Sequence, residues 1–79
     1  MVYENIKIYP NPTTGIVEIN LADHKINKLS IIDLYGRIII ENIPANQNET
    51  IDLSGFANGV YFIMLEKGEE VRISKIIKE

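Results

Sequence analysis

The sequence has no cysteine and no tryptophan, and it contains a single histidine. Without cysteine there is no disulfide framework, and no thiolate is present to act as a nucleophile or a metal ligand. The 79 residues provide enough material for one small hydrophobic core. We therefore expect residues 1–79 to form a single domain that is held together by side-chain packing alone.

Long apolar runs and clusters of like charge are also missing. The longest apolar run, Val60–Leu65, is far shorter than the roughly 20 residues of a transmembrane helix. The net charge is −3 with acids and bases scattered, so the basic stripe of a nucleic-acid-binding protein is absent. The sequence opens without the cationic and apolar regions of a secretory signal. If this domain is exported, we expect it to have been excised from a larger secreted precursor.

What the sequence does contain is a period-two pattern of mostly β-branched apolar residues. In the stretch GIVEINLA, Val17, Ile19 and Leu21 share one face while Glu18 and Asn20 take the other, which is typical of a half-buried strand. Strands are predicted over residues 6–9, 16–21, 28–34, 37–42, 50–53, 60–66 and 70–78. No helical pattern is present, so one sheet must pack on another. We predict an all-β fold, an antiparallel seven-stranded β-sandwich with immunoglobulin-like or Greek-key connections.

Glycines mark the predicted hairpin turns, because glycine accepts the positive φ that tight turns require. Tyr35–Gly36 is predicted as a two-residue turn, and Lys67–Gly68 is predicted to join the last two strands. The run Val60–Leu65 is apolar at every position, which predicts a central strand covered on both faces.

The stretch YPNPTTG, residues 9–15, predicts a rigid corner after the first strand. Pro10 and Pro12 lack an N–H group and hold the residues before them in extended conformations. Residues 11–14 fit a type I turn, and Gly15 is suited to the left-handed conformation that follows. A proline-rich corner also keeps the first strand from extending its pairing, which protects a sheet edge.

Few residues suggest catalysis. His24 lies in the polar stretch LADHKIN, where we expect a solvated loop residue. Ser30, Ser54 and Ser74 do not lie in the G-x-S-x-G arrangement of a nucleophile elbow. We therefore expect no enzymatic activity.

Three aspartates, Asp23, Asp33 and Asp52, offer the oxygen ligands that calcium prefers. Their spacing is not that of a calcium loop, and turn capping or an outward position on a strand explains each of them. We expect no metal and no cofactor.

Four stretches follow one another along the chain: YPNPTTG, IIDLYGRII, IDLSGFANGVYFIMLEKG and RISKIIK. Together they resemble the type A C-terminal sorting domain of the type IX secretion system, a family of Bacteroidota. The resemblance covers residues 6–79. It implies a secretion signal that follows an N-terminal cargo domain.

In that family the precursor crosses the inner membrane by an ordinary N-terminal signal, and the outer-membrane type IX translocon then recognises the C-terminal domain. A sortase-like surface protease commonly removes the domain and anchors the cargo. The resemblance thus implies a protein that reaches the cell surface or the medium through the periplasm and outer membrane.

The resemblance also singles out residues that would shape turns or present a recognition surface, none of them catalytic. The matching turn residues are Pro10, Asn11, Pro12 and Gly15 in the entry corner, Asp33, Gly36 and Arg37 in the central hairpin, and Gly59, Tyr61 and Gly68 in the terminal hairpin.

We expect the translocon to recognise the tail Lys75, Ile76, Ile77 and Lys78, because the end of the last strand can form an accessible edge that another strand joins. Ile76 and Ile77 are consecutive, so one of them must face outward unless a bulge intervenes. The outward isoleucine, with Lys75 or Lys78, would belong to the signal. Alternatively, the strand is apolar on both faces because both are covered.

A structural or adhesive immunoglobulin-like module, with carbohydrate binding as one option, remains the alternative function. Sugar-binding sandwiches display flat aromatic rings. Here Tyr61 and Phe62 alternate on a central strand, so we expect at least one of them in the core.

Overall fold

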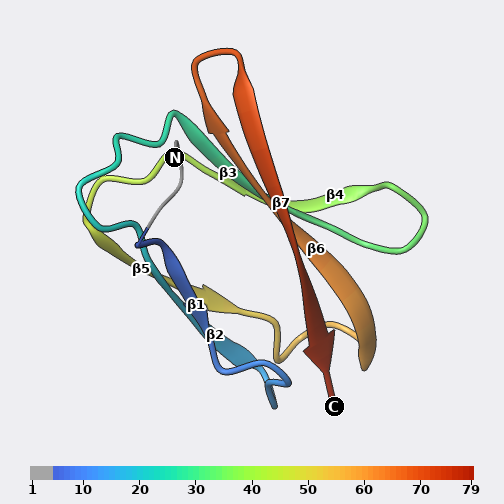
Figure 1. Ribbon diagram of the computed structural model, residues 1–79. Helices are drawn as coiled ribbons and strands as arrows, with labels where there is room; N and C mark the ends of the chain where they lie inside the picture. The colour runs from blue at the N-terminus through green and yellow to red at the C-terminus, as the bar shows by residue number, and fades with distance from the viewer. Residues whose placement is uncertain (1–4) are drawn as a thin grey trace.

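The computed structural model describes residues 5–79, so the first four residues of the expected domain lie outside the described part. The described chain forms two packed β-sheets (Figure 1). The strands are β1 (Lys7–Tyr9), β2 (Ile16–Asn20), β3 (Lys28–Ile32), β4 (Ile38–Asn42), β5 (Asn48–Asp52), β6 (Gly59–Lys67) and β7 (Glu70–Lys78).

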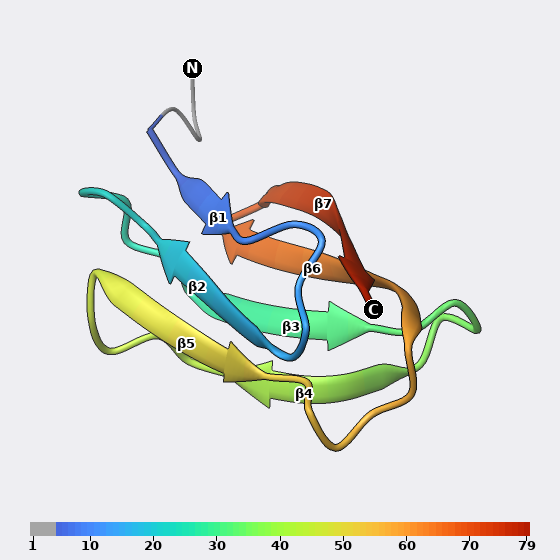
Figure 2. The same cartoon turned by 90° about the horizontal axis from the view of Figure 1, so that it is seen from below.

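The strands are distributed over a three-stranded sheet, ordered β1-β2-β5, and a four-stranded sheet, ordered β4-β3-β6-β7. Every paired neighbour within a sheet runs antiparallel. Figure 2 shows the two layers, with β1, β2 and β5 in front of the four-stranded sheet. The predicted all-β, seven-stranded antiparallel sandwich is confirmed.

The core lies between the two sheets and is built by the period-two pattern. Apolar side chains from both sheets and their connections face inward, and the fully buried ones are Val17, Ile19, Leu21, Leu29, Ile31, Leu53, Ile63, Leu65 and Ile76. Two polar residues, Thr13 and Ser30, are also fully buried. Phe56, in the connection between β5 and β6, packs against this cluster. Burial of these side chains is the main stabilising contribution, since the chain has no cysteine.

The prediction for the apolar run in β6 was half right. β6 lies between β3 and β7 and is therefore central. Tyr61, Ile63 and Leu65 point into the core, but Val60, Phe62 and Met64 on the other face are only half-buried. No second layer covers this face among the described residues. An apolar run identifies a central strand but does not reveal whether its second face meets protein or solvent.

Both predicted hairpin turns are shifted. Between β3 and β4, Gly36 donates its N–H to the Asp33 carbonyl at 3.1 Å and has φ 81°, so the loop has three residues, Leu34–Gly36, and ends on a left-handed glycine. Between β6 and β7 the register pairs Lys67 with Glu70, so the two turn residues are Gly68 and Glu69. Gly68, at φ 62°, takes the first turn position.

A pair of isoleucines tests how far stability depends on the inner face. Ile63 is 1% exposed and Ile73 is 60% exposed. We expect Ile63→Ala to lower the free energy of unfolding by about 2–5 kcal/mol, and Ile73→Ala to lower it by less than about 1 kcal/mol. Urea denaturation followed by circular dichroism measures both, and equal losses would contradict the assignment of the core.

Candidate functional site

The corner between β1 and β2 differs from its prediction. Asn11, Pro12 and Thr14 form bends rather than a type I turn, and Thr13 makes an isolated parallel bridge with Lys78 of β7. The Tyr9–Pro10 and Asn11–Pro12 peptide bonds are cis. Gly15 has φ 159°, which is nearly extended rather than left-handed. Space is also tight at this position, because a Cβ there would lie 3.3 Å from the Cβ of Ser54.

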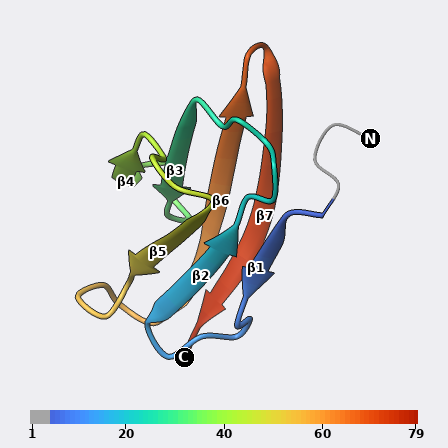
Figure 3. The same cartoon turned by 90° about the vertical axis from the view of Figure 1, so that its left-hand side faces the viewer.

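The corner lies beside the end of β7 (Figure 3). Asn11 Nδ2 donates to the Lys75 carbonyl at 3.0 Å, and the Ile77 N–H donates to Asn11 Oδ1 at 3.0 Å. The Thr13 N–H donates to the Ile77 carbonyl at 2.8 Å, and the Glu79 N–H donates to the Thr13 carbonyl at 2.9 Å. We call these contacts of Asn11 and Thr13 with β7 the clasp.

The chemistry of the clasp follows from the backbone. A strand at the edge of a sheet leaves one row of N–H and C=O groups unpaired. The carboxamide of Asn11 has the same donor and acceptor as a peptide group, so it pairs with β7 as a short strand would. The expected accessible edge at the end of the last strand is therefore wrong: the backbone from Lys75 to Glu79 is covered by the clasp.

Thr13 is held in place from within the corner. It is 2% exposed, and its Oγ1 donates to the Ile16 carbonyl at 2.6 Å and accepts the Gly15 N–H at 3.0 Å. The side chain thus fixes the turn into β2, while the backbone of the same residue binds β7. The sequence suggested only a polar turn residue here, because its partner strand lies at the other end of the chain.

The four tail residues of the predicted signal alternate between the two faces of β7. Ile76 is 1% exposed and lies in the core, whereas Ile77 is 36% exposed on the opposite face. Pairing of β7 with β6 runs in continuous register, so one outward isoleucine is present without a bulge, as predicted. Lys75 is exposed on the same face as Ile77, and Lys78 points inward with 8% exposure.

Lys78 is satisfied inside the domain. Its Nζ donates to the Phe56 carbonyl at 2.8 Å and to Asn58 Oδ1 at 3.1 Å. The hydrogen bonds from Ser54, with a smaller contribution from the Lys78 charge, hold the pKa of Asp52 below its ordinary value. Lys78 therefore ties the end of β7 to the β5–β6 connection, and the positive charge at the surface of the tail is that of Lys75.

The face of the four-stranded sheet that points away from the core is unusually apolar. We call it the outer face. Its clearly exposed apolar side chains are Val71, Ile73 and Ile77 of β7 and Ile38 of β4. Half-buried Val60, Phe62 and Met64 of β6 lie beside them, because the register pairs Met64 with Ile73 and Val60 with Ile77. Lys75 and Ile77 thus stand at the edge of a continuous apolar surface.

The central hairpin residues form one local network. Asp33 Oδ1 accepts the N–H groups of Tyr35 at 2.9 Å and Arg37 at 3.0 Å, and Asp33 Oδ2 accepts Arg37 Nε at 2.8 Å. The Arg37 guanidinium lies 5.3 Å from the centre of the Tyr35 ring. Partial burial by itself would raise the pKa of Asp33, but the hydrogen bonds and charge of Arg37, with the Tyr35 N–H, lower it overall. The sequence feature DLYGR is thus a self-contained turn.

In the terminal hairpin, Tyr61 is buried and its hydroxyl donates to the Ala57 carbonyl. Gly59 opens β6, and the Gly68 N–H donates to Asn27 Oδ1. Asn27 was missed from the sequence because it precedes β3 and is distant along the chain. The turn residues named by sequence therefore lie in three separate places. The entry corner contacts the outer edge of the tail, and Gly59 and Tyr61 pair with Lys78 and Ile76.

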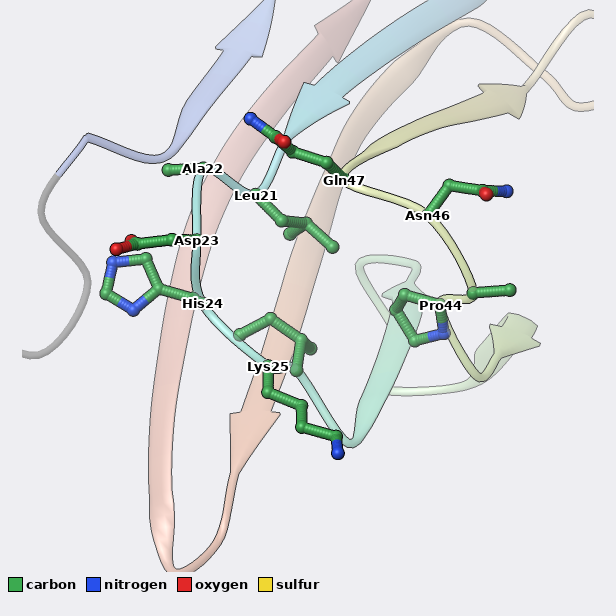
Figure 4. Close-up of a pocket in the computed structure, with 10 residues that line it drawn as sticks. Leu21, Ala22, Asp23, His24, Lys25, Pro44, Asn46 and Gln47 are labelled. Atoms are coloured by element: carbon green, nitrogen blue, oxygen red, sulfur yellow. The ribbon is translucent and has the colours of Figure 1, made fainter.

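The remaining candidates do not assemble a reactive centre. A depression of about 280 Å³ lies beside His24, between the β2–β3 and β4–β5 connections. Figure 4 shows the polar groups of Asp23, Lys25 and Asn46 pointing in different directions around it. His24 is half-buried rather than solvated, and its Nδ1 lies 3.0 Å from Lys67 Nζ.

Within residues 5–79, no group of three or more His, Asp or Glu side chains is placed to hold a metal ion. The same residues include no helix of the length and apolar character needed to span a membrane.

Residues 5–79 form a small β-sandwich whose entry corner clasps the end of its last strand. The chain belongs to the secretion system C-terminal sorting domain family, whose model matches residues 7–79. It is thus a C-terminal sorting signal for type IX secretion, as the resemblance in the sequence implied. A search of curated proteins finds no match to the chain.

Substitution of Thr13 tests whether the corner depends on its hydroxyl. Thr13→Val keeps the shape of the side chain but leaves the Gly15 N–H and Ile16 carbonyl without their partner. We expect a loss of about 1–3 kcal/mol in the free energy of unfolding. Thr13→Ser retains the hydroxyl and should lose only about 0.8 kcal/mol for the missing methyl group. Chemical denaturation compares the two, and a larger loss for Thr13→Ser would argue against this role.

The lowered pKa of Asp33 predicts a pH dependence. A carboxylate whose pKa falls below its ordinary value of 3.8 stabilises the fold at neutral pH, and this contribution is lost as the pH falls through the folded-state pKa. We expect Asp33→Asn to melt at a lower temperature than the wild type at neutral pH, with the difference shrinking below pH 3.8. Melting curves across the acid range measure it; a difference that grew toward acid pH would refute the assignment.

Proposed function

We propose that the type IX translocon recognises this domain through Lys75 and the outward side chain of Ile77, on the edge of the outer face. Of the four tail residues that the sequence suggested, Ile76 and Lys78 are taken up by packing and by internal hydrogen bonds. The observation that supports the proposal is the position of Lys75 and Ile77: exposed side chains on a backbone that the clasp holds fixed. A surface fixed in advance loses little conformational entropy when a partner binds.

The route follows the family. We propose that the domain accompanies an N-terminal cargo through the periplasm and across the outer membrane to the cell surface or the medium. There a sortase-like surface protease removes the domain. Catalysis belongs to that protease, and the domain itself serves as a ligand.

We also propose that the sandwich is immunoglobulin-like. In the immunoglobulin nomenclature, the order β4-β3-β6-β7 corresponds to C′-C-F-G and the order β1-β2-β5 corresponds to A-B-E. This assignment makes β7 the G strand and the clasp a contact of the A–B corner with G.

Nothing in the comparisons supports the adhesive or carbohydrate-binding alternative. Tyr61 has its ring in the core and its hydroxyl on a backbone carbonyl, and Phe62 is half-buried. These two rings therefore contribute mainly to packing.

An export assay with point variants tests the recognition surface. Removing residues 75–79 would also remove Ile76 from the core, so substitution of exposed side chains is more specific. A reporter with this domain at its C-terminus is expressed in a type IX-competent host. We expect the double variant Lys75→Glu, Ile77→Asp to reduce surface delivery about tenfold, the effect of losing roughly 1.4 kcal/mol of binding.

The matched control is Ile38→Asp, which places a charge on the same face but on the far edge strand, where Ile38 is 52% exposed. It should leave export unchanged. Circular dichroism verifies that both variants fold. If the double variant is exported as efficiently as the wild type, or if the control shows an equal defect, this surface is not the signal.

A further inference from the structure

The edge of β7 is open along part of its length. Outward backbone groups belong to alternate residues, and the clasp engages those of Lys75, Ile77 and Glu79. By the same alternation, the outward groups of Val71 and Ile73 point along the free edge. Among residues 5–79, neither residue has a hydrogen-bond partner at this edge. The open stretch therefore ends where Asn11 occupies the Lys75 carbonyl.

This open stretch carries exposed apolar side chains. Val71 is 50% exposed and Ile73 is 60% exposed, and both continue the outer face. Natural proteins commonly protect an edge of this kind, because another strand can add to it. The carboxamide of Asn11 lies beside the strand at the next outward position.

We propose that Asn11 is an edge guard, and that without it β7 pairs antiparallel with β7 of a second copy of this chain, with Ile73 opposite Ile73. This register needs outward groups from Val71 to Lys75 only. Val71 then lies opposite Lys75 of the second copy, and the Lys75 carbonyl that Asn11 now occupies receives a backbone N–H instead. The pairing is symmetric about a two-fold axis, so both copies use the same residues.

Charge distribution along β7 selects the antiparallel direction and a second copy as the partner. Exposed Glu69 and Glu70 lie at the start of the strand, and exposed Lys75 lies toward its end. Antiparallel pairing brings the acidic end of each copy beside the basic end of the other, whereas parallel pairing would bring like charges together. On the outer face, Ile73 meets Ile73, and the aliphatic part of Lys75 covers Val71.

Sedimentation velocity over a hundredfold concentration range tests the proposal. We expect the wild-type domain to remain a single chain, and Asn11→Ala to rise with concentration toward the mass of two chains. The matched variant Asn11→Ala, Ile73→Lys places two ammonium groups opposite each other at the two-fold axis and should return to a single chain. Because Ile73 is 60% exposed, this change leaves the core intact.

A disulfide provides a second readout of register. The chain has no cysteine, and directly opposed residues in a hydrogen-bonded antiparallel pair have Cα atoms about 5.5 Å apart, within the range that a disulfide spans. Ile73→Cys should therefore cross-link quickly in the Asn11→Ala background and slowly with Asn11 present. Ile38→Cys, on the other edge strand, should cross-link slowly in both backgrounds.

Circular dichroism establishes folding, and Asn11→Ser replaces Asn11→Ala if the latter does not fold, since a serine hydroxyl is too short to reach both β7 groups. The proposal is overturned if the folded Asn11 variant stays a single chain, or if the Ile73→Lys variant associates equally well. Equal cross-linking at positions 38 and 73 would likewise overturn it. None of these outcomes bears on export, so they are independent of the translocon proposal.

Discussion

The structure depends on how the backbone N–H and C=O groups of one edge strand, β7, find hydrogen-bond partners. β7 is nine residues long, and among the strands of residues 5–79 it pairs along its full length with β6 alone. Its unpaired backbone groups would be exposed along the other side, and the corner at Asn11 and Thr13 supplies partners for the end of the strand. The Asn11 contacts join residues 64 and 66 positions apart in the sequence. The end of β7 is thus held by the corner at Asn11 and Thr13, near the start of the described chain. Each of the two segments depends on the other for its position.

Local pattern accounts for the parts of the fold that could be predicted from sequence. Alternation of apolar and polar residues locates the strands, because one face of each strand meets the core and the other does not. The turn positions were shifted by one residue at Gly68 and lengthened at Gly36. A glycine marks where positive φ is permitted, but the pairing register decides which turn position it takes. That register comes from contacts across the sheet, which local residues do not encode.

Two misjudged features share a physical reason: their partners are distant in sequence. From the sequence, Asn11 is expected only to shape a turn, but in the structure its carboxamide bonds to β7. Lys78 is expected at the surface, but its ammonium group bonds to the Phe56 carbonyl and to Asn58. The outer face of β6 was expected to be covered, because an apolar run has no feature that distinguishes a packed neighbour from solvent. Sequence suggested which tail residues matter, and the structure divides them into Ile76 and Lys78 facing inward and Lys75 and Ile77 facing outward.

Because tail side chains alternate between two faces, a sorting signal on β7 shares the strand with residues that hold the strand in the fold. On a strand, adjacent side chains point to opposite faces, so a partner that binds the outer face contacts only every second residue. The intervening residues, Ile76 and Lys78, anchor the strand to the core and to the β5–β6 connection. Residues that fold the tail and residues that present it are therefore interleaved, and a shift of one position would exchange their roles. Under the proposed recognition, the signal is a folded surface whose geometry requires the clasp, and the tail in isolation would lack that geometry.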